Sequence, residues 1–266
     1  MILAFSNAGV FAAAAGAATA YAVLALATSR LGKSTVRGLL LAAWLLHALT
    51  LVEALLGTPP RFGFAPALSM TVWLLLTVYA VERRLFPQLQ AHWALAGLGT
   101  AAVLLSLVFP GTAYHAIASA WLPLHWALGI ASYGLFAAAA VHGWLMVRAE
   151  RAIRQGGQID TGVPLLTLER LTFRFVEAGF VLLSATLAVG WLFAETLYGP
   201  GLVWKWDHKT VFSLLAWAAF AGLLTGRARL GWRGLKAVRV LYLGTGLLLL
   251  SYVGSRFVLE VILGRA

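Results

Sequence analysis

The stretch Gly38–Gly57, GLLLAAWLLHALTLVEALLG, decides the fold class of this chain. A helix needs about 20 predominantly apolar residues to cross the hydrocarbon core of a bilayer, and this stretch supplies them. Basic residues stand before it at Lys33 and Arg37, and its ionisable side chains are His47 and Glu53. The stretch therefore predicts a membrane-spanning helix.

Seven further apolar runs fill most of the 266-residue chain. With the first they predict eight spans, at residues 8–28, 38–57, 66–86, 91–109, 123–147, 172–195, 209–226 and 240–262. Only helices and closed barrels satisfy the backbone polar groups inside a bilayer, and these runs do not alternate polar and apolar residues. We expect an all-α polytopic integral membrane protein with eight transmembrane helices, forming a single transmembrane domain over residues 1–266. No basic segment precedes the first run, so we expect no cleavable signal.

Basic residues collect in alternate gaps between the predicted spans. The gaps after the first, third, fifth and seventh spans hold Arg30, Lys33, Arg37, Arg83, Arg84, Arg148, Arg151, Arg154, Arg170, Arg227, Arg229, Arg233, Lys236 and Arg239. The other gaps hold only Arg61, Lys205 and Lys209. Because basic loops stay in the cytoplasm, we expect both termini to be extracytoplasmic.

The composition excludes several classes of function. Charged residues make up 11% of the chain, against about 25% in globular proteins, so there is no room for a soluble catalytic domain and we expect no enzyme activity. The formal charge of +11 does not indicate nucleic-acid binding, because membrane topology accounts for the basic loops. The chain has no cysteine, which excludes disulfides and a thioether bond to heme.

Ionisable side chains within spans are unfavourable unless paired or wet, so each is a candidate for function. His125 opens the span at 123–147, with Gly129 and Ser132 on the same helical stripe. It is either a ligand beside a closely packed surface or an interfacial histidine at a helix start. His47 lies near mid-membrane and is either functional or hydrogen-bonded to a neighbouring helix.

Two other groups favour structural interpretations. His92 and His142 lie near the inner face, where we expect water to reach them. Arg170, Arg174 and Glu177 follow one another at helical spacing and predict a ladder of ion pairs near the same face.

The segment Tyr198–Lys209, YGPGLVWKWDHK, is the most unusual part of the chain. Two tryptophans flank a lysine, and an acid, an imidazole and a second lysine follow. An aromatic belt at the membrane surface explains the tryptophans but not these polar neighbours. Aromatic rings beside cations suit a planar, anionic ligand. Heme is such a ligand, and imidazole is the commonest protein ligand of its iron.

Several segments resemble a known family. Trp204–Lys209 resembles the end of the tryptophan-rich WWD segment of the cytochrome c assembly family, which includes CcsA, ResC and CcmC-type heme-handling membrane proteins. Leu124–Tyr133 resembles the family's histidine-led helix. The compact YpjD/HemX-type branch is indicated by Pro164–Arg170, Gly231–Gly234 and Ser251–Arg256. The likeness runs from about residue 120 to the C-terminus and is weaker before that. We expect the part of the chain that corresponds to the family to extend over about residues 65–263.

The resemblance implies a bacterial inner-membrane protein that binds heme near the outer face and passes it to an assembly partner. It implies a heme-binding role for His125, Trp204, Trp206, Asp207 and Lys209, and more loosely for His47.

The chain departs from the family at the second outer histidine, where Gly254, Ser255 and Arg256 stand instead. We therefore infer His208 as the second iron ligand beside His125. The hypothesis is a b-type, non-covalent heme, with propionates met by Lys205, Lys209, Arg61 or Arg256 and with His47 as an inner waystation.

Two alternatives stay open. A non-heme accessory or transporter subunit would depend on Glu53, His47 and Glu260 and not on the tryptophan segment. A regulator of heme biosynthesis would act through the basic segments 148–171 and 227–239. The expected partners are heme and the lipid bilayer, with cytochrome c assembly or heme-biosynthesis proteins and without nucleic acid.

Overall fold

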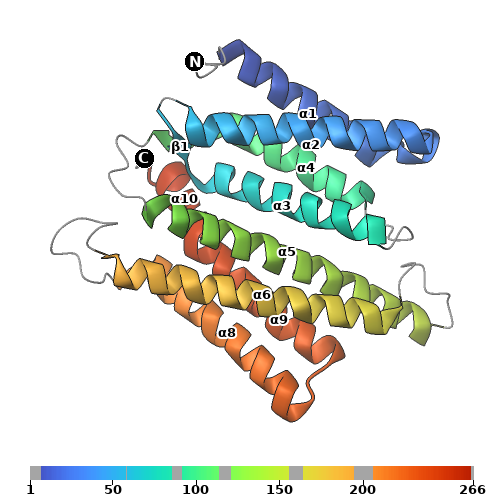
Figure 1. The fold of residues 1–266 in the computed structure, drawn as a ribbon, viewed down its shortest axis with the longest axis vertical. Helices are drawn as coiled ribbons and strands as arrows, with labels where there is room; N and C mark the ends of the chain where they lie inside the picture. Colours follow the sequence, from blue (N-terminus) through green and yellow to red (C-terminus); the bar gives the residue numbers. More distant parts are fainter. Residues whose placement is uncertain are drawn as a thin grey trace. The chain divides into compact units, whose positions relative to one another are not determined.

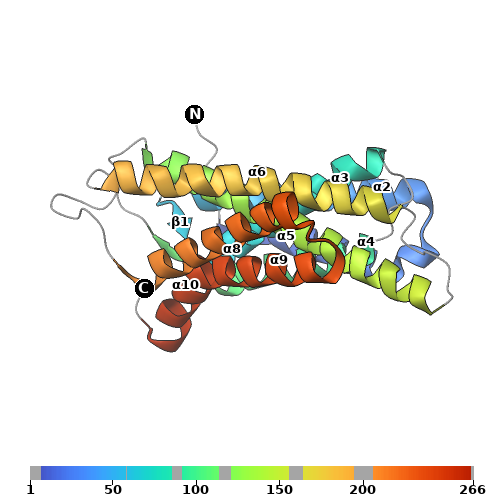
Figure 2. The ribbon, with the colours of Figure 1, turned by 90° about the horizontal axis from the view of Figure 1, so that it is seen from below.

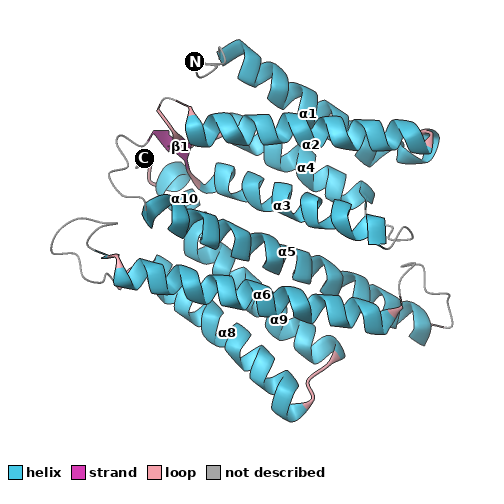
Figure 3. Cartoon of the chain, viewed as in Figure 1, coloured by secondary structure: helices cyan, strands magenta, loops and turns pink. Residues whose placement is uncertain are grey.

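The computed structural model describes residues 7–57, 59–85, 92–113, 121–155, 164–194 and 206–264, which are helical except for two short strands and connecting turns (Figure 3). Seven helices in this described part are long and apolar enough to cross a membrane, and the apolar helix Ala94–Val108 is shorter. The prediction of an all-α polytopic membrane protein is confirmed. The number of spans and the outward termini stay predictions.

The elements follow the predicted spans closely (Figure 1). They are α1 (Asn7–Ala27), η1 (Thr28–Arg30), α2 (Lys33–Leu56), β1 (Arg61–Phe62), α3 (Phe64–Leu85), α4 (His92–Val108), β2 (Thr112–Ala113), α5 (Trp121–Arg154), α6 (Leu165–Leu192), α8 (His208–Leu230), α9 (Gly234–Leu249), the π-helical turn η2 (Leu250–Gly254), α10 (Ser255–Phe257) and the π-helical turn η3 (Val258–Ile262).

The chain divides into two compact units. Unit 1 comprises Met1–Val81, Leu89–Ala116 and Arg256–Ala266, and unit 2 comprises Glu82–Gln88 and Ile117–Ser255. The expectation of one transmembrane domain over 1–266 is not tested by this division and stays a prediction.

In unit 1, α1 packs against both α2 and α4. An aromatic pair lies between α2 and α3, where Trp44 and Trp73 stack with ring centroids 4.8 Å apart. Trp44 Nε1 donates to Thr77 Oγ1 at 2.8 Å, so the indole polar group is satisfied inside the helix layer. The short strands β1 and β2 pair antiparallel, with Arg61 opposite Ala113.

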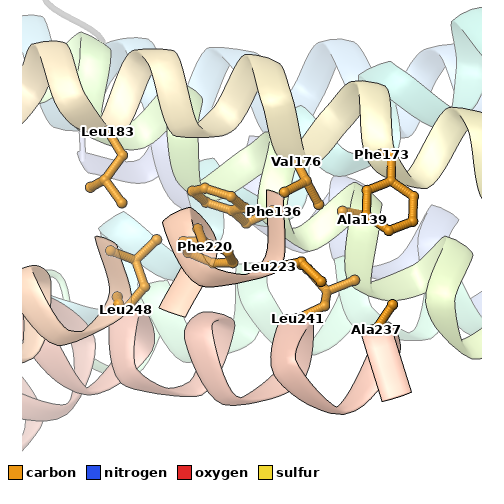
Figure 4. Close-up of a cluster of buried hydrophobic side chains, with 11 residues drawn as sticks. Phe136, Ala139, Phe173, Val176, Leu183, Phe220, Leu223, Ala237, Leu241 and Leu248 are labelled. Carbon is orange, nitrogen blue, oxygen red and sulfur yellow. The ribbon is translucent and has the colours of Figure 1, made fainter. Parts of the chain in front are cut away.

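Unit 2 is built from α5, α6, α8 and α9, and Figure 2 shows α8 and α9 lying side by side. Its core is a cluster of buried apolar side chains from all four helices, which are Phe136, Ala139, Phe173, Val176, Leu183, Ala216, Phe220, Leu223, Ala237, Leu241 and Leu248 (Figure 4). At its centre the rings of Phe136 and Phe220 stack with centroids 3.7 Å apart. Each ring lies against a glycine of a neighbouring helix, since a Cβ at Gly179 would be 3.1 Å from Phe136 and one at Gly244 would be 2.7 Å from Phe220.

The ends of α8 are fixed by local chemistry. Asp207 is the N-cap residue, and its carboxylate accepts a hydrogen bond from the Thr210 amide at 2.8 Å. Gly231 ends the helix in the left-handed conformation with φ +63°. The cap at Asp207 places His208 and Lys209 in the first turn of α8.

Candidate functional site

The imidazole of His125 lies in the first turns of α5 and is held by α6. Its Nδ1 lies 3.1 Å from the backbone carbonyl oxygen of Thr186. A carbonyl oxygen only accepts hydrogen bonds, so Nδ1 carries the proton and donates it. A neutral ring in this tautomer keeps a lone pair on Nε2, the atom that an iron ion would bind. The ring is half-buried, so it is neither fully solvated nor sealed in the core.

A cation and an aromatic ring lie at the same end of unit 2. The ammonium group of Lys209 is close enough for its charge to act on the His125 ring. Its Nζ also lies 5.2 Å from the ring centroid of Tyr252 in η2, within the range of a cation–π contact. Side chains from α5, α8 and η2 therefore meet beside the α6 carbonyl that holds His125. We call His125, Thr186, Lys209 and Tyr252 the His125 cluster.

The remaining described members of the predicted segment surround the start of α8. Trp206 is 74% exposed, and Asp207 and His208 are exposed as well. Asp207 caps the helix, which is a structural role that the sequence analysis missed. An aspartate three residues before Thr210 at the start of an apolar run is itself a helix-start signal. Trp204 and Lys205 lie outside the described residues, as does His115.

His47 has a different environment in unit 1. The side chain is fully buried in α2, and its Nε2 lies 2.8 Å from Ser69 Oγ on α3. The Tyr21 ring of α1 meets it edge-on, with centroids 5.8 Å apart. The structure thus contains the interhelical hydrogen bond that was one of the two open interpretations, and Nε2 is already engaged.

Arg256 and Glu260 also belong to unit 1, where Glu260 has a local structural role. Its carboxylate accepts a hydrogen bond from the Phe64 amide and feels the charge of Arg256. A Cβ at Gly63 would lie 2.9 Å from both carboxylate oxygens, so they sit directly over the chain entering α3. Glu260 thus serves as a cap for α3, where an acidic group is favourable.

A buried pair that the sequence analysis did not identify lies in unit 2. Glu82 Oε1 and His142 Nε2 are 3.1 Å apart, and the two residues are 5% and 3% exposed. The atoms lie at ion-pair distance but are not aligned for a hydrogen bond. His142 Nδ1 lies 2.8 Å from the Ala138 carbonyl oxygen. The expectation of a wetted His142 is wrong, because a carboxylate partner lets the imidazole stay buried.

The predicted ladder of Arg170, Arg174 and Glu177 is not among the ion pairs of the described residues. The pair near that end of α6 instead joins Glu169 to Arg233, with Nε 3.4 Å from Oε1. This ion pair joins α6 to the residue that precedes α9, whereas the prediction placed the ion pairs along α6 itself.

A family model described as "Cytochrome C assembly protein" matches residues 34–263. The chain belongs to this family. The match begins before the expected core boundary of about residue 65, so it covers α2 and most of unit 1 as well as unit 2.

Three curated relatives illustrate the similarity. An uncharacterized 28.8 kDa protein in the nifR3-like 5'region of Azospirillum brasilense is 33% identical over 147 residues, 54% of each chain. The inner membrane protein YpjD of Escherichia coli K12 is 35% identical over 99 residues, 37% of this chain and 36% of YpjD. The cytochrome c biogenesis protein CcsA of Gloeobacter violaceus is 30% identical over 94 residues, 35% of this chain and 27% of CcsA. The chain thus spans about half the length of these relatives or less. No solved structure matches significantly.

The His125 cluster offers one imidazole nitrogen and one neighbouring cation as ligand-binding groups. In the described part of the chain, no group of three or more His, Cys, Asp or Glu side chains could hold a metal ion. A heme needs only axial ligands from the protein, because the macrocycle supplies the others. His125 offers one imidazole nitrogen, and Lys209 offers a cation for a carboxylate.

Proposed function

We propose that this chain binds heme non-covalently at the His125 cluster and delivers it for cytochrome c assembly. The observation that carries the proposal is the His125 imidazole, held by the Thr186 carbonyl through Nδ1 with Nε2 available, in a chain of the cytochrome c assembly family. The location that fits is the bacterial inner membrane, because the chain is a multi-pass membrane protein and one relative carries that location in its name.

His125 and the residues around the start of α8 have distinct tasks in this proposal. His125 Nε2 would supply one ligand to the iron, and His208 in the first turn of α8 would supply a second. Lys209 and Lys205 would pair with the propionates. Trp206 and Trp204 would provide apolar contact for the macrocycle. Asp207 acts indirectly, because its cap fixes where His208 and Lys209 stand.

The residues of unit 1 have secondary roles. Arg256 and Arg61 are further partners for propionates, and His47 is an inner waystation for heme. The waystation requires Ser69 to release His47 Nε2, since the two atoms are 2.8 Å apart in this structure. The chain holds and transfers its ligand without catalysing a reaction, and its partners are heme-receiving assembly proteins.

The test is the visible absorption spectrum of the pure protein from heme-replete membranes. Wild type is expected to show a Soret band that His125→Ala loses. Gly129→Ala is the matched control, because a Cβ there meets Thr186 Cγ2 at 3.5 Å, which is ordinary contact on the same face of α5. Wild-type protein without a Soret band, before and after adding hemin, would refute the proposal, as would an unchanged band in His125→Ala.

A second candidate is a membrane subunit that handles protons and binds no heme. It is favoured by the buried Glu82–His142 pair, since ionisable groups within spans often serve proton paths. This function predicts that Glu82→Gln abolishes activity in cells while His125→Ala does not. The transporter subunit that would depend on Glu260 is less well supported, because Glu260 already serves as a cap for α3.

A further inference from the structure

The hydrogen bond that holds His125 depends on a feature of α6. Thr186 lies inside this helix, where its carbonyl oxygen also faces the amide of Gly190 one turn on. Helical side chains lean toward the N-terminus and cover the preceding turn, so a side chain at 190 would lie over this carbonyl. Glycine leaves the carbonyl open to a group from another helix.

The position of the imidazole agrees with this geometry. A Cβ at Gly190 would lie 3.1 Å from His125 Cε1 and 3.6 Å from Nδ1. The ring of α5 therefore occupies the space that a side chain at 190 would fill. Even alanine would force the ring to shift by a few tenths of an ångström or to turn away from Thr186.

We propose that Gly190 is the positioning residue for His125. By leaving the Thr186 carbonyl uncovered, it lets α6 fix the imidazole as the Nδ1–H tautomer and turn Nε2 toward the ligand. The inference rests on the proposed function, because it specifies how the heme-binding imidazole is held. Some protein groups orient a metal-binding histidine through its second nitrogen, and the loss of such a group typically lowers metal affinity by about 10- to 100-fold.

The neighbouring polar groups cannot do the same task. The Thr186 hydroxyl donates to the Leu182 carbonyl at 2.7 Å, and Ser132 donates to the Gly129 carbonyl at 2.7 Å. The acceptor for His125 is thus the Thr186 backbone and not its side chain. Gly129 also faces α6, but a Cβ there would meet Thr186 Cγ2 at 3.5 Å, which is ordinary contact. Gly129→Ala is therefore a matched control at the same helix interface.

The first test needs no heme. Protein labelled with ¹⁵N-histidine is placed in lipid nanodiscs, and the His125 signals are assigned by their loss in His125→Ala. We expect the Nδ1–H tautomer in wild type and in Gly129→Ala, and a loss of this tautomer preference in Gly190→Ala. An Nε2–H tautomer in wild type, or an unchanged tautomer in Gly190→Ala, would overturn the inference. Should Gly190→Ala fail to fold, an Nε2–H tautomer in wild type would still overturn the inference.

The second test titrates hemin into the same samples. Gly190→Ala is expected to bind hemin about 10- to 100-fold more weakly than wild type and to show an altered Soret band, while Gly129→Ala binds as wild type does. Equal affinity in Gly190→Ala and wild type would overturn the positioning role. Absence of hemin binding in wild type refutes the proposed function instead, and the tautomer measurement separates these two failures.

Discussion

His47 and His125 are the same residue type in two different settings. His47 is sealed in unit 1 and its Nε2 is engaged with a hydroxyl, whereas His125 is half-buried in unit 2 and uses Nδ1 on a backbone carbonyl. A histidine whose Nε2 already has a partner stabilises a helix pair. A histidine whose Nδ1 is anchored can present Nε2 to a ligand only where no protein group already lies there, as Glu82 does at His142. The surroundings of Nε2 therefore separate a packing role from a binding role.

A second buried imidazole, that of His142, sharpens the comparison and gives the largest expected effect. His142→Ala leaves the buried carboxylate of Glu82 without its partner, which costs about 3–5 kcal/mol of stability. The measurement is unfolding in detergent. The double variant Glu82→Met with His142→Leu is expected to recover most of the loss, because it removes both polar groups. Unaltered stability in His142→Ala would show that the pair is not buried.

His47 itself gives a smaller effect on stability. Ser69→Ala removes the partner of a buried imidazole nitrogen and is expected to lower the free energy of unfolding by about 1–3 kcal/mol. Hemin affinity is expected to stay within twofold of wild type. Adding His47→Phe to Ser69→Ala should be nearly neutral, since the unsatisfied nitrogen is then absent. A large loss of hemin affinity in Ser69→Ala would contradict the packing role.

Lys209 gives the smallest effect. Lys209→Gln removes one partly exposed cation beside His125 and is expected to weaken hemin binding about two- to fivefold, with the difference decreasing at high salt. Lys236→Gln at the other end of α8 and α9 is the matched control, because Lys236 also packs on an aromatic ring. Equal weakening by both variants would indicate a general effect of charge.

Local patterns in the sequence were sufficient for most of the fold. The run at 66–86 became α3 at Phe64–Leu85, because an unbroken apolar run leaves a helix as its stable form in lipid. The predicted span at 172–195 marks only the apolar part of α6, which begins at Leu165. The leucines among Glu169, Arg170 and Arg174 predict a helix that enters the membrane over residues 164–175, and α6 confirms this helix.

The candidate site was predictable only in part. His125 could be found because it opens an apolar run beside a family motif. Thr186 and Gly190 could not, since a backbone carbonyl and a missing side chain carry no signal until α5 and α6 are packed. Glu82 could have been found, because a carboxylate inside a predicted span is a candidate by that fact alone. Its pairing with His142 depends on tertiary structure.

The comparison between the two histidines is tested most directly by titrating hemin into His125→Ala and His47→Gln in identical nanodiscs. We expect His125→Ala to bind at least about 100-fold more weakly than wild type, because the iron loses an anchored ligand. We expect His47→Gln to bind within twofold of wild type. Retained binding in His125→Ala, or a comparable loss in both variants, would contradict the assignment of His125 as the heme ligand.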